Sequence, residues 1–339
     1  MAEQALAAYT TSRVGGPAAE LVTARTEAEL IEAVRSADDA GIPLLLLGGG
    51  SNLLVGDDGF EGRVVLIRTE GVSADVDACG GAVVRVAAGE SWDALVARAV
   101  DNGWIGVEAL SGIPGQVGAT PIQNVGAYGQ EVAETIASVR CWDRRAGAVT
   151  TLFNVDLRFG YRTSLLKAEP GRFVVLEVVW QFRLGDLGTP VGYAELAGRL
   201  GVAIGERAPA ADVRAAVLGL RQAKGMVLDE TDHDTWSTGS FFTNPVVDPA
   251  EVPQGAPSWP QDGGQVKTSA AWLIEHAGFA KGYGAGAATL STKHTLALTN
   301  RGSARTEDLL ALAREVRDGV RERFGITLVN EPHLIGCAL

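Results

Sequence analysis

Two glycine-rich loops constrain this chain more than any other feature of its sequence. The first loop, residues 47–55, reads LGGGSNLLV and follows the apolar run at residues 44–47. Three successive residues without a Cβ let the backbone turn sharply after a buried strand, so that several N–H groups can converge on one anion. A diphosphate is such an anion. We therefore interpret the following residues as cofactor-binding: Gly48, Gly49, Gly50, Ser51 and Asn52.

The second loop, residues 113–129, reads IPGQVGATPIQNVGAYG and is long for an ordinary connection. Its amide and phenol side chains suit polar and stacking contacts with a flat heterocycle. Together the two loops predict a flavin site. The candidate cofactor-binding residues in this loop are Ile113, Pro114, Gly115, Gly118, Gln123, Asn124, Gly126 and Tyr128.

Composition limits the possible partners and the location of the chain. The 339 residues suffice for two or three packed units, and the net charge of −12 without a basic stripe argues against nucleic acid. No run approaches the roughly 18 to 20 apolar residues of a membrane span, and no basic segment leads an apolar one at the start, so we expect a cytoplasmic protein. Three widely spaced cysteines, Cys79, Cys141 and Cys337, predict buried reduced thiols and no metal site.

Apolar periodicity and capping residues predict five helices, at residues 26–41, 92–100, 211–224, 268–276 and 306–324. Thr26 with Glu29 forms a capping box, and Ser91 and Thr306 are the expected N-caps of their helices. Strand-like runs occupy residues 20–23, 44–47, 63–68, 82–88, 136–142, 173–182 and 326–329. The aperiodic, polar and aromatic stretch at residues 229–244 is typical of a functional loop.

Five motifs, taken in order along the chain, resemble the UDP-N-acetylenolpyruvoylglucosamine reductase (MurB) family of bacterial peptidoglycan synthesis, in its longer class with a tyrosine loop. Two are the glycine-rich loops. The others are residues 160–164 (GYRTS) with Lys167, residues 239–245 (GSFFTNP), and Asn330-Glu331 ahead of Ile335-Gly336.

This resemblance implies an α+β fold. A two-subdomain FAD-binding region of the vanillyl-alcohol-oxidase (PCMH) type would occupy residues 1–205, with subdomains of about 1–70 and 71–205. A C-terminal α/β substrate-binding domain would occupy residues 206–330, and a tail at residues 331–339 would carry Glu331.

The resemblance also implies the reaction, which reduces an enolpyruvyl ether to a lactyl ether, with NADPH as reductant and non-covalent FAD as cofactor. Hydride would add to C3 of the enolpyruvyl group, and charge would develop on C2 and the carboxylate, where a cation or a hydrogen-bond donor stabilises it. Arg162 and Glu331 are expected to stabilise this enolic intermediate, and Ser240 to donate a proton to C2.

The family places its substrate contacts at positions that correspond here to Tyr161, Tyr193, Lys224, Asn244, Lys267 and His294. No GxGxxG or Walker motif is present, and the resemblance implies that NADPH and the UDP-sugar use one site in turn on a monomer. Three residues depart from the family pattern: Thr243 replaces a frequent lysine, His294 a glutamine of some members, and Pro332 follows the glutamate.

Two other functions fit parts of the sequence. An oxidase or dehydrogenase of the same flavin fold would keep both glycine loops but would have no need for Ser240 and Glu331. A flavin-binding module without catalysis would not need Arg162 either, and only turnover separates it from an enzyme.

Overall fold

The computed structural model describes residues 5–339, without the side chain of Asp262. The expectation of a cytoplasmic protein rested in part on residues 1–4, which lie outside the described residues. The chain forms two compact units: unit 1 comprises residues 1–19, 50–61 and 223–339, and unit 2 comprises residues 20–49 and 62–222. The boundary expected at residue 205 stays a prediction.

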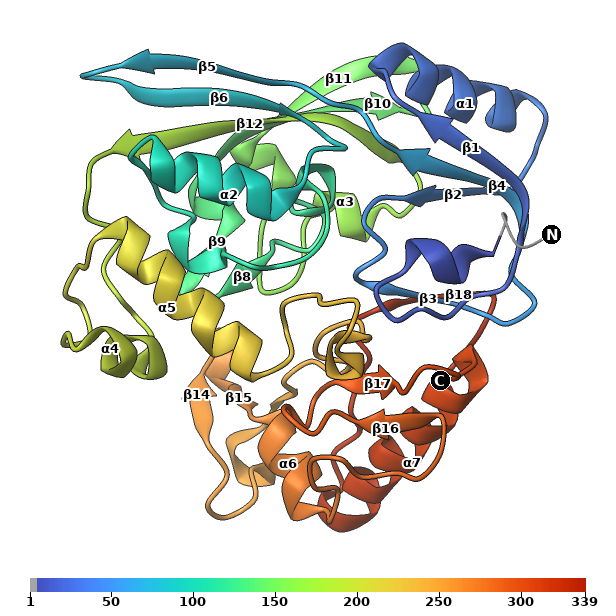
Figure 1. The fold of residues 1–339 in the computed structure, drawn as a ribbon, viewed down its shortest axis with the longest axis vertical. Coiled ribbons are helices and arrows are strands. Elements are labelled where there is room, and N and C mark those ends of the chain that lie inside the picture. Colours follow the sequence, from blue (N-terminus) through green and yellow to red (C-terminus); the bar gives the residue numbers. More distant parts are fainter. Residues whose placement is uncertain (1–4) are drawn as a thin grey trace. The chain divides into compact units, whose positions relative to one another are not determined.

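The main sheet of unit 2 is antiparallel and six-stranded (Figure 1). The strand order is β11-β10-β12-β6-β5, with β7 also pairing with β12. The central strand, β12, is the longest of the six, and its apolar run pairs with β10 on one side and with β6 on the other. The strands are β5 (Val72–Asp77), β6 (Gly81–Ala87), β7 (Trp104–Ile105), β10 (Ile136–Asp143), β11 (Ala148–Phe153) and β12 (Phe173–Leu184).

Helix α2 (Trp92–Asp101) covers this sheet and closes its core. Its buried residues Trp92, Leu95 and Val96 belong to one cluster with Val84 and Trp180 of the sheet. The side chain of Ser91 accepts the N–H of Ala94, which confirms the expected N-cap.

A smaller sheet has the order β1-β4-β2 and packs against α1 (Glu27–Asp39). Its strands are β1 (Ala18–Ala24), β2 (Leu44–Leu47) and β4 (Phe60–Ile67), with β2 parallel to β4. Thr26 accepts the N–H of Glu29 as predicted, but the Glu29 carboxylate accepts from Arg25 instead of Thr26. Half of the expected capping box is therefore present.

The rest of unit 2 consists of α5 (Ala210–Ala223) and short elements, several of which pack on the core of the six-stranded sheet. Helix α4 (Ala194–Leu200) packs on α5 through Leu196, Val213 and Val217. The remaining elements are β8 (Gly126–Ala127), β9 (Gln130–Glu131), α3 (Leu165–Ala168) and the 3-10 turns η3 (Glu108–Leu110), η4 (Val117–Ala119), η5 (Val132–Glu134) and η6 (Asn154–Leu157).

Unit 1 is built around the amphipathic helix α7 (Thr306–Phe324). Its apolar face includes Leu309, Leu310 and Val316 and packs with α6 (Ala270–His276), as the periodicity predicts. The strands are β3 (Leu53–Val55), β13 (Val246–Val247), β14 (Ser258–Pro260), β15 (Val266–Thr268), β16 (Ala288–Leu290), β17 (Leu298–Asn300) and β18 (His333–Ile335), and the 3-10 turns are η2 (Leu6–Tyr9), η7 (His233–Thr235), η8 (Pro249–Glu251) and η9 (Asp262–Gly264). Within residues 5–339, none of the helices combines the length and apolar character that crossing a membrane requires.

The N-terminus of α7 is capped from a distant part of the chain. The Asp57 carboxylate accepts the N–H of Thr306 at 2.9 Å and that of Glu307 at 3.1 Å. Thr306 is the first helical residue, and its hydroxyl donates to the carbonyl of Val55. The expectation that Thr306 caps the helix is therefore wrong, because a carboxylate brought in by the fold satisfies those N–H groups.

Three further expectations are corrected. Residues 326–329 form no strand: Ile326 and Leu328 are buried in the core of unit 1, and the backbone pairing that follows is an isolated bridge of Asn330 with Phe242. Helix α6 begins at Ala270, because Ser269 caps it and residues 266–268 pair in a sheet. Cys79 is exposed in the turn between β5 and β6, whereas Cys141 is buried, which raises the pKa of its thiol to about 12.

Removal of the distant cap should destabilise unit 1. We expect Asp57→Ala to lower the free energy of unfolding by about 1 kcal/mol, because two N–H groups of the first turn of α7 lose their acceptor. Denaturant unfolding of the FAD-loaded protein measures this change. Asp58→Ala, at the exposed neighbouring position, is the control, and equal unfolding midpoints for the two variants would contradict the prediction.

Candidate active site

The two glycine-rich loops lie against each other, as expected for loops that bind one cofactor. A Cβ atom on Gly49 would lie 2.7 Å from the Cα of Gly115, and one on Gly48 would lie 2.7 Å from the side-chain oxygen of Gln116. The carbonyl of Gly115 also accepts the N–H of Trp92 at 3.1 Å, at the start of α2. Only residues without a Cβ permit this approach of two backbones.

The first loop offers backbone donors to an anion. Among the hydrogen bonds between residues 5–339, none uses the N–H of Gly49 or Gly50 as donor. Gly50 is buried with a φ of 63°, and a Cβ on it would lie 1.9 Å from the carbonyl oxygen of Tyr9. A turn of this kind fits the diphosphate of a flavin dinucleotide, because oxygens of that group accept converging N–H bonds.

Asn124 holds the second loop in shape. The residue is buried with a φ of 48°, and its side-chain nitrogen donates to Glu131 at 2.6 Å and to the carbonyl of Gly160 at 3.2 Å. Its side-chain oxygen accepts the N–H of Ala133 at 3.1 Å. The amide therefore joins three segments of unit 2, a structural role that the sequence did not predict.

The guanidinium of Arg162 lies on this second loop. Its Nη1 donates to the carbonyl of Asn124 at 3.2 Å, and its Nη2 donates to the carbonyl of Gly126 at 2.6 Å. The guanidinium also lies 5.3 Å from the ring centroid of Tyr161. The expected catalytic arginine and the expected flavin loop are thus neighbours within unit 2.

The residues after Arg162 fix its backbone. Lys167 donates through Nζ to the carbonyl of Arg162 at 2.9 Å, and the Ser164 hydroxyl donates to the carbonyl of Ile122 at 2.6 Å. Ser164 also caps α3. Arg162 has a φ of 52°, a left-handed conformation that a non-glycine residue adopts only when its surroundings hold it.

Tyr128 and Tyr193, from the second loop and the tyrosine loop, pack together. Their ring centroids lie 5.5 Å apart with the rings nearly perpendicular. Tyr193 is 47% exposed and immediately precedes α4. The tyrosine loop is therefore joined to the expected flavin loop in this conformation, and whether it closes on a substrate stays a prediction.

A buried carboxylate that the sequence analysis missed anchors the same region. Glu108 is fully buried, and its side chain accepts the N–H of Gly106 at 2.7 Å, the N–H of Thr189 at 2.6 Å and the amide of Gln130 at 2.8 Å. Gly106 belongs to the same segment as Glu108, whereas Thr189 directly precedes the tyrosine loop (residues 190–196) and Gln130 directly follows the second glycine-rich loop. The sequence did contain a signal for this role, a single carboxylate within the apolar stretch at residues 104–110. A carboxylate in such a stretch is expected to be buried, and a buried carboxylate is rarely found without hydrogen-bond partners.

The other cofactor candidates lie in or beside these loops. Ile113 packs on the core of the six-stranded sheet. A Cβ on Gly118 would lie 2.5 Å from that of Ala88, so this loop also needs glycine where it passes β6. The remaining candidates are Pro114 and Gln123 in the second loop and Ser51 and Asn52 before β3.

Ser240 and Glu331 are brought together within unit 1. Phe242 and Asn330 form an antiparallel bridge, and the N–H of Glu331 donates to the carbonyl of Phe241 at 2.8 Å. The side-chain nitrogen of Asn330 donates to the carbonyl of Pro332 at 2.8 Å. The departure at Pro332 is thus accommodated in a turn that keeps Glu331 beside the Ser240 segment.

The expected substrate contacts of unit 1 have mixed surroundings. The side-chain oxygen of Asn244 accepts the N–H of Ala270 at 2.9 Å, which gives it a structural role at the start of α6. Lys267 lies on the central strand of a three-stranded sheet, and His294 lies in the turn between β16 and β17. Lys224 follows α5 directly.

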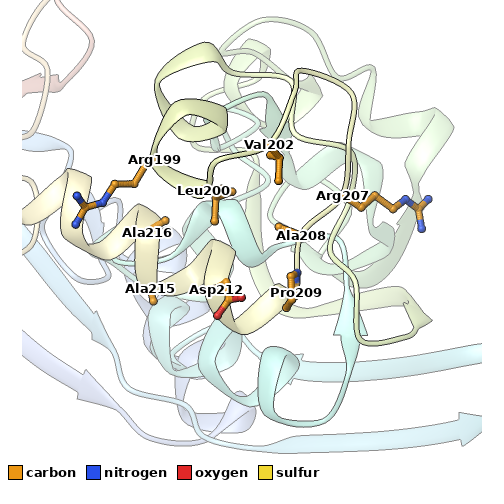
Figure 2. A pocket seen from close by; sticks show the side chains of 9 residues that line it. All are labelled: Arg199, Leu200, Val202, Arg207, Ala208, Pro209, Asp212, Ala215 and Ala216. Atoms are coloured by element: carbon orange, nitrogen blue, oxygen red, sulfur yellow. The ribbon is translucent and has the colours of Figure 1, made fainter.

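A surface hollow of about 550 Å³ between α4 and α5 contains none of the expected site residues. In Figure 2 the guanidinium groups of Arg199 and Arg207 point away from it on opposite sides. The hollow therefore offers no converging charge to a ligand, and we do not include it in the site.

Comparison with known proteins defines the class first. Residues 18–152 match a family of FAD binding domains, which contains both glycine-rich loops. Residues 230–335 match the C-terminal domain of UDP-N-acetylenolpyruvoylglucosamine reductase. The chain is therefore a flavoprotein oxidoreductase with FAD as its cofactor, and its fold class is the one expected from the sequence.

Similar proteins define the family. The UDP-N-acetylenolpyruvoylglucosamine reductase of Cutibacterium acnes is 59% identical, over 98% of this chain and 90% of that protein, and that of Streptomyces coelicolor is 57% identical over the same shares. The crystal structure of the Thermus caldophilus reductase (MurB) matches with a TM-score of 0.67 and 29% identity, over 98% of this chain and 97% of that one. The chain belongs to the UDP-N-acetylenolpyruvoylglucosamine reductase family.

The contact between the two loops should govern FAD binding. We expect Gly49→Ala to weaken FAD binding by about 10- to 100-fold, because the added methyl group separates the loops at Gly115. Titration of the apoprotein with FAD, followed by flavin fluorescence, measures the affinity. Gly198→Ala is the matched control, since a Cβ there meets no atom within 4 Å, and an unchanged affinity of the Gly49 variant would contradict the prediction.

Proposed function

We propose that this protein reduces UDP-N-acetylglucosamine enolpyruvate to UDP-N-acetylmuramate, with NADPH as the reductant. Membership of the reductase family supports the substrate class. The observation that carries the proposal is the pairing of the Ser240 and Glu331 segments through the 2.8 Å hydrogen bond from Glu331 to Phe241. An alcohol oxidase of similar fold has no need for a proton donor and a carboxylate arranged in this way.

The chemistry sets the demands on the protein. When bound, FAD supplies the hydride for C3 of the enolpyruvyl group. Negative charge then develops on C2 and on the adjacent carboxylate, and donors held in place before the reaction stabilise it best. The side chains that bind the substrate must also exclude water and deliver one proton to C2.

Arg162 is suited to the carboxylate. A guanidinium remains charged and can form two parallel bonds to a carboxylate. The carbonyls of Asn124 and Gly126 and the ring of Tyr161 restrict the orientation of Arg162, so little freedom is lost when an anion binds. We assign Arg162 to stabilisation of the enolic intermediate.

Ser240 and Glu331 complete the proposed chemistry. Ser240 would donate its hydroxyl proton to C2, which is feasible because an enolate is a strong base. Glu331 would help to stabilise the enolic intermediate, and its backbone hydrogen bond to Phe241 keeps it near the Ser240 segment.

Substrate contacts are assigned from the resemblance and from charge. Lys224, Lys267 and His294 would contribute positive charge or hydrogen bonds to the diphosphate, which a chain of net charge −12 must supply locally. Tyr161, Tyr193 and Asn244 would complete the site. A single site for NADPH and the UDP-sugar, a monomeric state and a cytoplasmic location belong to the same proposal, and family resemblance supports them.

Anaerobic half-reactions test this function. The FAD-loaded protein is bleached with NADPH, and UDP-N-acetylglucosamine enolpyruvate is then added while the flavin absorbance is followed. Prompt reoxidation with formation of UDP-N-acetylmuramate is the expected result. Reoxidation by oxygen alone would exclude this substrate.

Ser240 can be tested in the same experiment. We expect Ser240→Ala to slow reoxidation by about 10²- to 10⁴-fold, because the proton donor is lost, and to leave bleaching by NADPH unchanged. Ser303→Ala, an exposed serine of unit 1, is the control. Equal slowing of both half-reactions would point to a folding defect and contradict the role.

A further inference from the structure

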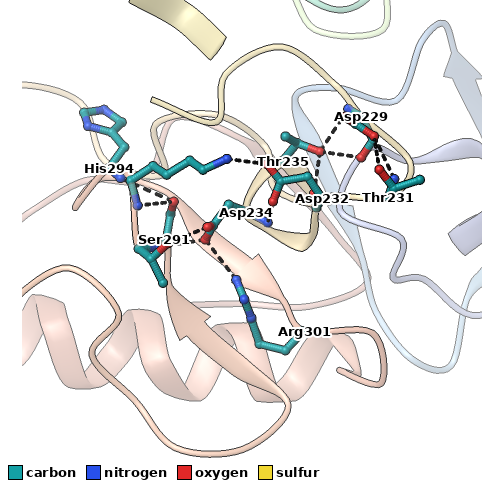
Figure 3. Close-up of polar contacts among 10 residues, drawn as sticks. Asp229, Thr231, Asp232, Asp234, Thr235, Ser291, His294 and Arg301 are labelled. Atoms are coloured by element: carbon teal, nitrogen blue, oxygen red, sulfur yellow. Dashed lines mark hydrogen bonds and ion pairs between the residues drawn. The ribbon is translucent and has the colours of Figure 1, made fainter. Parts of the chain in front are cut away.

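A second buried carboxylate lies in unit 1, in the loop that leads to Ser240 (Figure 3). Asp234 is 5% exposed. Its Oδ1 accepts the N–H of Thr292 and a guanidinium N–H of Arg301, both at 2.9 Å, and its Oδ2 accepts the Thr292 hydroxyl. Burial favours a raised pKa, but the hydrogen bonds from Thr292 and Arg301 outweigh it and hold the pKa of Asp234 below its usual value.

These contacts attach Asp234 to the turn between β16 and β17. Within that turn, Ser291 accepts the N–H groups of Lys293 and His294, at 3.0 and 3.3 Å. The N–H of Ser291 donates to the carbonyl of Ala297 at 2.8 Å. The turn is therefore internally bonded, and a displacement at Thr292 should move it as a whole.

The same turn is bonded to the backbone next to Ser240, and through it to Glu331. The carbonyl of Leu296 accepts the N–H of Phe241 at 2.8 Å, next to Ser240. The carbonyl of Phe241 in turn accepts the N–H of Glu331 at 2.8 Å. A path of hydrogen bonds, linked by the peptide bonds Ser291–Thr292 and Leu296–Ala297, thus leads from the Asp234 carboxylate through the turn to the backbone beside Ser240 and to Glu331.

The segment between Asp234 and Ser240 is fixed along its length as well. The carbonyl of Trp236 accepts the N–H of Asn300 at 3.0 Å, and that of Ser237 accepts the Thr11 hydroxyl at 2.7 Å. The Ser237 hydroxyl accepts the N–H of Gly239 at 3.1 Å. Asp234 lies at the start of this braced segment.

We propose that Asp234 is a positioning residue that holds Ser240 and Glu331 in register through the β16–β17 turn. The inference rests on the proposed function, since it concerns the delivery of a proton by Ser240. Asp234 does not touch the substrate in this role. It acts because small displacements of a proton donor reduce the rate of transfer steeply.

Glu230, in the same loop, provides the control. Its carboxylate pairs with Arg13 at 3.0 Å, and its side chain is 83% exposed, so the pair contributes little. Asp232 is unsuitable, because its carboxylate accepts the N–H of Asp234 at 3.0 Å and pairs with Lys293 of the turn itself. Glu230 and Asp234 therefore share a loop and a charge but differ in their attachment to the turn.

The test uses the FAD-loaded full chain and both anaerobic half-reactions. We expect Asp234→Ala to slow reoxidation by UDP-N-acetylglucosamine enolpyruvate by about 10- to 100-fold and to increase its solvent deuterium isotope effect, with bleaching by NADPH little changed. Asp234→Asn keeps the acceptor for Thr292 and Arg301 and can donate to the Thr292 hydroxyl, so it should remain close to the wild type. Glu230→Ala should also resemble the wild type.

The outcomes separate the inference from the proposed function. A wild-type protein that the substrate fails to reoxidise would overturn the proposed function, and this inference with it. Normal wild-type turnover, together with equal rates for Asp234→Ala and Glu230→Ala, would overturn the inference alone. If Asp234→Ala does not fold, Thr292→Val removes only the hydroxyl bond, and a reoxidation rate and isotope effect equal to those of the wild type would overturn the inference.

Discussion

The close approach of Gly49 and Gly115 is the contact on which the candidate site of unit 2 depends. It brings the end of β2 to the loop whose carbonyl accepts the first N–H of α2, and the Gln116 amide donates to the carbonyl of Ile67 at 2.9 Å in the same region. Sheet, helix and cofactor loop therefore meet at one junction. A side chain larger than hydrogen at Gly49 would have to displace backbone there, which is more costly than moving a flexible side chain.

Buried or half-buried carboxylates connect distant segments in both units. Glu108 joins Thr189, just before the tyrosine loop, to Gln130, just after the second glycine-rich loop. Asp57 caps α7, and Asp234 holds the β16–β17 turn. Each accepts backbone N–H groups, and a carboxylate is suited to this because its two oxygens accept several bonds at once.

Local signals predicted local structure well. Helices α1, α2, α5 and α7 and strands β2, β6, β10 and β12 lie within one or two residues of their expected ends, because apolar periodicity and the caps Thr26 and Ser91 act within one turn. The wrong expectations involve distant partners: the segment at residues 326–330 pairs with Phe242 in an isolated bridge and not in a strand ladder, and the cap of α7 comes from Asp57. The sequence offered the glycine loops, Arg162, Ser240 and Glu331 as candidate site residues. It gave no role to Glu108 or Asp234, since the burial of a carboxylate depends on residues far along the chain.

The sequence by itself determined the residue types that the chemistry requires and the order in which they occur, since glycines, caps and apolar runs act on their own neighbourhood. It also indicated the reductase family, which the comparisons confirm. Only the tertiary structure decided that Arg162 donates to carbonyls of the second loop and that the N–H of Glu331 donates to Phe241. It alone also showed that the side chains of Asn124 and Asn244 form hydrogen bonds that hold the fold together. The reason is physical: hydrogen-bond partners far apart in sequence are chosen by packing, which no local pattern of residues encodes.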